Sequence, residues 1–299
     1  MSSGLALGLL ASLLWGIVDV SVAIATQRIG SLRMLVGAQV TSVAVLIVVI
    51  AATPAMLGTD PVAGLAAGLP LGVLAAGAYL GYFLALRIGP ISIVSPVIVA
   101  YGGATVVLAI LLRGESLAPM QGVGAGLATL GVILAAITFH GGSLRGARIV
   151  GPGIIAAVAT LILFAVVTVG LAAPIQDHGW LSVITGSRIA NCTTSVVLFL
   201  GIRRTRSSRF RPLLWPSLKP TRATFALVAV AGVFDMSAFV AYAMGLAVAP
   251  TWLVGLASSF APVIVVAYAV WRLGERPRST QWLGLVLIAA GVVVLALAG

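Results

Sequence analysis

The sequence predicts an all-α integral membrane protein in which ten transmembrane helices form two inverted five-helix repeats. Three observations predict this fold. The 299 residues are 61% hydrophobic and 8% charged, with a mean hydropathy of +1.21, whereas soluble domains carry roughly 25% charged residues. Apolar segments long enough to cross roughly 30 Å of hydrocarbon recur along the whole chain. The two halves of the sequence also resemble each other.

Ten apolar segments are the expected spans. They lie at 4–24, 34–53, 62–86, 91–112, 119–139, 151–173, 181–202, 223–246, 251–271 and 280–298. No basic region precedes the first segment, so we expect it to be a span that stays attached and not a removable signal peptide. The longest polar connection, 201–222, is far too short to fold into a soluble domain. Any function must therefore reside inside the helical bundle.

Basic residues in a membrane protein first indicate its orientation. Of the 17 Lys and Arg residues, 15 fall in the loops after odd-numbered spans, which leaves Arg113 and Arg188 for the opposite face. This distribution predicts that the odd-numbered loops are cytoplasmic and that both termini are extracytoplasmic.

An internal repeat is visible when the sequence is compared with itself. A constant offset of 160 aligns about 55 residues without a gap, including Tyr82 with Tyr242, Pro90 with Pro250, Glu115 with Glu275, Gln121 with Gln281 and Gly131 with Gly291. The predicted repeats are residues 1–142 and 143–299. A repeat with an odd number of spans must lie upside down relative to its copy, as in many secondary transporters, and this plan places a binding site near the midplane between the halves.

Several motifs carry a resemblance to a known family. They are LLWG in the first span, LRMLVGA at the start of the second, ALRIGPISIVSP before the fourth, and RGE or GER ahead of a Gly-rich span. With these motifs the chain resembles, over essentially its whole length, the EamA family of the drug/metabolite transporter superfamily. It looks most like the bacterial amino-acid and aromatic-metabolite exporters of the YddG kind.

The resemblance implies a multi-pass protein of the bacterial inner membrane that moves a small organic solute, such as an aromatic amino acid or a related metabolite. Export by alternating access around a central aromatic-lined cavity is the implied mechanism. A proton-coupled drug or nucleoside exporter is the alternative, and a facilitator, a membrane scaffold or a membrane enzyme are further ones. Proton coupling predicts that Asp19→Asn or Asp235→Asn removes the pH dependence of counterflow.

Asp19 and Asp235 are the two acids that fall inside predicted spans. An ionised carboxylate there costs roughly 2.5–3.5 kcal/mol, so such residues usually face a cavity or a partner. Either acid could contact an ammonium group or carry a proton, or could simply hold two helices together. The repeat matches Asp19 to about Thr168 and Asp235 to Ala75, so their roles need not be the same. Glu115 and Glu275 occupy equivalent turns, where we expect helix capping or a loop salt bridge.

Aromatic residues accompany both acids at helical spacing. Trp15 shares a face with Asp19, and Phe239 and Tyr242 share one with Asp235. Aromatic walls with a few polar points are typical of small-molecule sites, although aromatic residues in spans also pack against lipid or neighbouring helices. The buried amides Gln39 and Asn191 could bind either a ligand or a helix. The predicted substrate-binding residues are Trp15, Asp19, Gln39, Tyr79, Tyr82, Tyr101, Phe164, Asn191, Asp235, Phe239 and Tyr242.

Two prolines and a set of glycines have predicted mechanical roles. Pro96 and Pro262 each remove a backbone hydrogen bond and can kink their spans, so we predict a gating role for both. Glycines spaced by four, at 64, 68 and 72 and at 122 and 126, predict close helix packing.

No P-loop, nucleophile elbow or zinc-ligand spacing occurs in the sequence. We therefore expect neither an enzyme nor a protein with a cofactor or metal, and no nucleic-acid partner. The expected partners are a small-molecule substrate and the lipid bilayer. A monomer should suffice, because the fused halves supply each other's partner.

Overall fold

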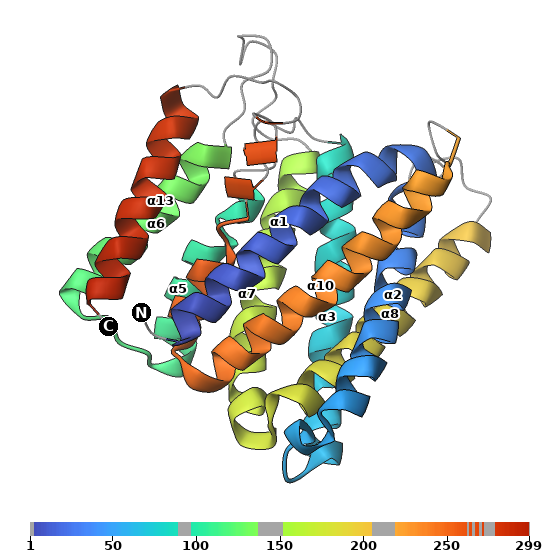
Figure 1. The fold of residues 1–299 in the computed structure, drawn as a ribbon, viewed down its shortest axis with the longest axis horizontal. Helices are drawn as coiled ribbons and strands as arrows, with labels where there is room; N and C mark the ends of the chain where they lie inside the picture. Colours follow the sequence, from blue (N-terminus) through green and yellow to red (C-terminus); the bar gives the residue numbers. More distant parts are fainter. Residues whose placement is uncertain are drawn as a thin grey trace.

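The computed structural model describes residues 3–88, 97–136, 152–204, 219–261, 263–264, 267–268, 271 and 279–298. These residues form α-helices and one 3-10 turn (Figure 1). The first half contributes α1 (Ser3–Ile29), α2 (Ser31–Ala52), η1 (Pro54–Leu57), α3 (Pro61–Ile88), α5 (Tyr101–Arg113) and α6 (Pro119–Ala136). The second half contributes α7 (Pro152–His178), α8 (Trp180–Arg204), α10 (Arg222–Val248), α11 (Thr251–Ser258) and α13 (Ser279–Leu297).

Seven of the described helices are long and apolar enough to cross a membrane: α1, α2, α3, α7, α8, α10 and α13. Two further apolar helices, Val97–Arg113 and Pro119–Leu134, are shorter. Each predicted span overlaps one helix, although the segments predicted at 91–112 and 251–271 lie partly outside the described residues. The prediction of an all-helical chain with many apolar helices is confirmed for these parts of the chain.

The main packing partners come from opposite halves of the sequence. α1 lies along α10, α2 packs on α10 and α8, and α3 packs between α7 and α8 (Figure 1). α6 pairs with α13 at one margin of the bundle, and α5 packs on α11 and α7. The interior is therefore enclosed by helices from both halves.

Glycines allow one of these pairs to approach very closely. A methyl group placed on Gly68 would overlap the carbonyl of Val183 on α8, and one on Gly64 would overlap Ser182. The predicted packing role of the α3 glycines is confirmed. For Gly122 and Gly126 it is wrong, because both are exposed and nothing lies within 4 Å of an added Cβ. Those two residues lie on the outer face of α6, while Gly131, on another face of the helix, meets the α13 backbone.

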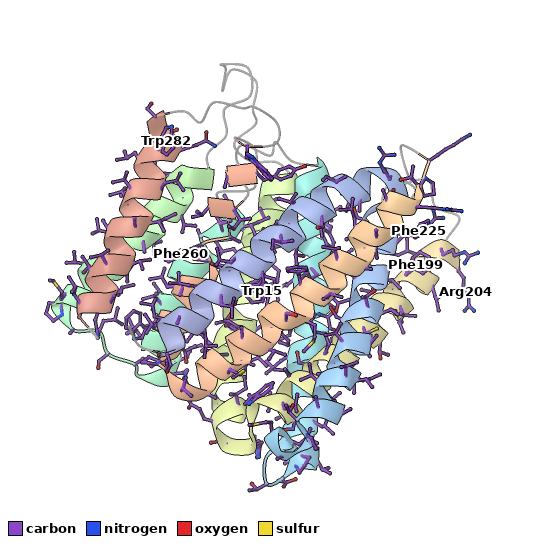
Figure 2. The ribbon with its side chains drawn as sticks, in the orientation of Figure 1. Trp15, Phe199, Arg204, Phe225, Phe260 and Trp282 are labelled. Carbon is purple, nitrogen blue, oxygen red and sulfur yellow. The ribbon has the colours of Figure 1, made fainter. Side chains whose placement is uncertain are left out.

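Polarity is arranged inside out relative to a soluble protein. Large apolar side chains are exposed on the outside of the bundle, for example Val62 at 75% and Leu111 at 71%. Polar and charged side chains such as Gln39, Arg188 and Asp235 are buried. Figure 2 shows Trp15 at the middle of the bundle, whereas Phe225 and Trp282 lie at its margins. This arrangement suits a lipid environment, in which interior polar groups mark functional sites.

Candidate functional site

A buried ion pair lies between α8 and α10. Arg188 Nη1 donates to Asp235 Oδ2, with the nitrogen and oxygen 2.6 Å apart, and the two side chains are only 3% and 4% exposed. Arg188 also donates to Gln39 Oε1 at 3.0 Å, and its guanidinium lies 4.4 Å from the centre of the Phe239 ring. Each charge is thus neutralised inside the bundle, as burial of an ion requires.

Asp235 also accepts hydrogen bonds from neutral donors on three other helices. Its Oδ1 accepts from Trp15 Nε1 on α1 at 3.1 Å and from the Tyr79 hydroxyl on α3 at 3.0 Å. The Ser42 hydroxyl on α2 lies 3.1 Å from Oδ2 and 2.9 Å from the Gly232 carbonyl, and can donate to one of them at a time. One carboxylate therefore connects five helices.

These six residues will be called the Asp235 cluster. Its members are Trp15, Gln39, Ser42, Tyr79, Arg188 and Asp235.

Asp19, one helical turn after Trp15 on α1, has a different environment. Among the described residues its carboxylate accepts one hydrogen bond, from the Tyr82 hydroxyl at 3.3 Å, and it forms no ion pair. Asp19 is half-buried, so part of its surface is accessible, whereas Asp235 is closed off. The two acids of the spans are therefore not equivalent in structure.

Three aromatic rings surround Phe164 of α7, and one of them, that of Tyr82, carries the hydroxyl that donates to Asp19. The Phe164 ring centre lies 5.5 Å from that of Tyr79, 6.5 Å from Tyr82 and 5.9 Å from Tyr101. All four rings are half-buried. We call Tyr79, Tyr82, Tyr101 and Phe164 the aromatic wall. Tyr101 is anchored to α11, since its hydroxyl lies 3.1 Å from Ser258 Oγ.

A second aromatic group borders the Asp235 cluster. The Tyr242 ring lies 5.5 Å from the Trp15 ring and stacks on the Phe239 ring at 6.4 Å. Tyr242 is only 3% exposed, yet its hydroxyl has no hydrogen-bond partner among the described residues. This group therefore contacts the cluster through Trp15 and Arg188.

Outside the bundle interior, Glu115 follows α5 and binds the start of α11. Its carboxylate accepts from the backbone N–H groups of Thr251 and Trp252, each at 3.1 Å, and from Arg113 Nε at 3.1 Å. Partial burial raises the pKa of Glu115, but these donors outweigh burial and leave the pKa below its usual range. The carboxylate therefore caps the N-terminus of α11.

Comparison with known proteins identifies the family. The model of the EamA-like transporter family matches residues 2–137 and again residues 151–297. The chain belongs to the EamA-like transporter family. A solved structure described as "Crystal structure of protein" shares 22% sequence identity with it, covers 99% of each chain and superposes with a TM-score of 0.76, which shows a common fold. No curated protein matches the chain.

Membership of this family makes the chain a multi-pass membrane transporter of small solutes, because EamA proteins are transporters and not enzymes. The kinship with YddG-type exporters stays a prediction, since the matched structure shows the fold alone.

The structure of this EamA-like transporter connects nine of the eleven predicted site residues through direct contacts with one another, and Gln39 joins them through Arg188. Asn191 is the exception. It is buried on α8 and its Oδ1 accepts from Ser195 Oγ at 3.3 Å, so this hydrogen bond lies within its own helix. The predicted gating residues Pro96 and Pro262 lie outside the described residues. Glu115 caps α11 and pairs with Arg113, as expected, while Glu275 also lies outside them.

Two members of the Asp235 cluster were not predicted. Arg188 was counted with the extracytoplasmic face and not as an interior residue, but it lies in α8 and is buried. Its position within the predicted span 181–202 was a usable signal, since a charge inside a span generally has a partner there. Ser42 gave no such signal, because a serine in a helix is most often bonded to its own backbone.

Proposed function

We propose that this EamA-like transporter exports a small organic solute bearing an amino group, such as an amino acid or an aromatic metabolite, across the bacterial inner membrane. One observation carries the proposal. Asp19, a half-buried acid, accepts a hydrogen bond from one neutral donor among the described residues and lies beside the aromatic wall. Aromatic surface with one or two placed polar groups is the usual composition of a small-molecule site.

The Asp235 cluster holds residues that border this site in fixed positions. Tyr79 belongs to both groups, because its hydroxyl binds Asp235 while its ring meets Phe164 edge-on. Trp15 fixes α1 to α10 just one turn from Asp19. Sites are most selective when the residues that contact the ligand are held by others in fixed positions.

Alternating access is the proposed mechanism, with residues 1–142 and 143–299 as two inverted five-helix halves. The candidate site draws Asp19, Tyr82 and Tyr101 from the first half and Phe164 from the second. Relative movement of the halves would therefore open the site to one side of the membrane or the other. Pro96 and Pro262 are the proposed kinks that permit this movement.

A thermal-shift screen of the purified protein against amino acids, nucleosides and drugs tests the proposal. We expect stabilisation by aromatic amines or amino acids, and loss of that stabilisation in Phe164→Ala with the unliganded melting temperature less affected. Solutes that stabilise the protein in this screen should then exchange across the liposome membrane in a counterflow assay. Stabilisation by no solute, together with no counterflow, would contradict the proposal and favour a scaffold.

A further inference from the structure

The charges of the described interior do not balance. Asp19 and Asp235 lie in the middle of α1 and α10, and Arg188 is the cation that the described part of the spans places among them. Arg188 binds Asp235. One carboxylate, that of Asp19, is therefore left without a positive partner within the described residues.

Arg188 is not available to a ligand in this structure. Its guanidinium binds Asp235 and Gln39, lies over the Phe239 ring, and is 3% exposed. A solute carboxylate that entered beside Asp19 would find no cation and would face a like charge. Burying an unpaired carboxylate in this way is strongly unfavourable.

An amino group would instead find two favourable partners. It would pair with the Asp19 carboxylate, and Tyr82, whose hydroxyl donates to that carboxylate, belongs to the aromatic wall, a type of surface that attracts cations. The remaining aromatic wall offers apolar surface to a ring on the same solute. Charge and surface together therefore specify an aromatic amine that lacks a carboxylate.

We propose that the Asp19 site selects aromatic monoamines of net positive charge over the corresponding zwitterionic amino acids and anionic acids. The inference rests on the proposed function and narrows its substrate class. The same ring is expected to bind well or poorly according to the charged groups it carries.

Three indole compounds test the inference because they share a ring and differ in charge. Tryptamine is a cation, tryptophan a zwitterion and indole-3-propionate an anion. With the full-length protein in detergent, we expect calorimetric titration to give tryptamine an affinity about tenfold or more above tryptophan, and indole-3-propionate the weakest binding.

Variants at Asp19 assign the selectivity to its charge. Asp19→Asn should reduce the ratio of the tryptamine affinity to the tryptophan affinity to about one. Asp19→Glu, which keeps the charge, should retain most of the wild-type ratio. Asp177→Asn, at an exposed acid in the last turn of α7, is the matched control and should leave the ratio unchanged. Asp19→Glu keeps the test informative even where Asp19→Asn fails to fold.

The inference is overturned by tryptophan binding as tightly as tryptamine, or by Asp19→Asn keeping the wild-type ratio. It is also overturned when none of the three indoles binds while other solutes still exchange in counterflow, and in that case the proposed function stands. Absence of exchange for every solute would instead contradict the proposed function itself.

Discussion

Removing either member of the Arg188–Asp235 pair should destabilise the protein far more than removing both. Arg188→Met leaves the Asp235 carboxylate with only its neutral donors, and Asp235→Asn leaves a buried guanidinium without a counterion. Loss of one partner from a buried pair costs about 3–5 kcal/mol. We place Arg188→Met near the lower end of that range, because the Trp15 and Tyr79 hydrogen bonds still stabilise the carboxylate.

The double variant should lose less stability than either single one. With both charges absent, the remaining penalty is the loss of the hydrogen bond to Gln39, at about 1 kcal/mol, because the Ser42 hydroxyl keeps the Gly232 carbonyl as an acceptor. The coupling energy of the cycle should therefore be several kcal/mol, well above the error of such measurements.

Equilibrium unfolding in mixed detergent micelles, followed by circular dichroism, measures the four free energies. Phe199→Leu, a partly buried site on α8 outside the cluster, serves as a control for general sensitivity of this helix. The reasoning is refuted if the double variant loses as much unfolding free energy as the two single variants lose together, because the two charges would then not interact.

Three further substitutions, two of them paired with a control variant, test other contacts. Gly68→Ala should destabilise by about 1–3 kcal/mol through overlap with backbone, whereas Gly126→Ala, in open space, should be neutral in the same unfolding assay. Tyr79→Phe should cost about 1–3 kcal/mol by leaving a buried carboxylate short of a donor, but Tyr242→Phe should cost almost nothing, since its hydroxyl has no hydrogen-bond partner among the described residues. Glu115→Gln should cost about 1 kcal/mol at neutral pH. Because the folded pKa of Glu115 is lowered, its contribution is complete above the unfolded value of 4.5, and the difference between variant and wild type should vanish as pH falls below the folded pKa.

The helices were predictable because hydrocarbon thickness sets the length of an apolar span, and hydropathy reports that length directly. α10, at Arg222–Val248, lies within two residues of the predicted 223–246. Helix ends were less predictable. α1 continues to Ile29 and α7 to His178, five residues past each predicted end, because a helix can extend beyond the apolar segment into polar residues that hydropathy excludes.

The site was predictable to the level of residue type and helix face but not of partner. Spacing placed Trp15 and Asp19 on one face of α1, yet Trp15 binds Asp235 and Asp19 binds Tyr82. Tyr79 and Tyr82, almost one turn apart on α3, serve different acids. Spacing along one helix fixes which side chains share a face, whereas the residue opposite each one depends on how two helices pack, which sequence alone does not contain.

The repeat explains why the two acids differ. The offset of 160 matches Asp235 to Ala75, while the looser likeness of the first and sixth spans matches Asp19 to about Thr168, and both of these uncharged residues are buried. Acids at all four positions would place four carboxylates around the single guanidinium of Arg188 in the described interior, leaving three without a counterion. With one acid in each half, Arg188 neutralises Asp235 and only Asp19 remains unpaired. On the proposed function, a single amine neutralises this single unpaired carboxylate, so we expect one cation per binding event.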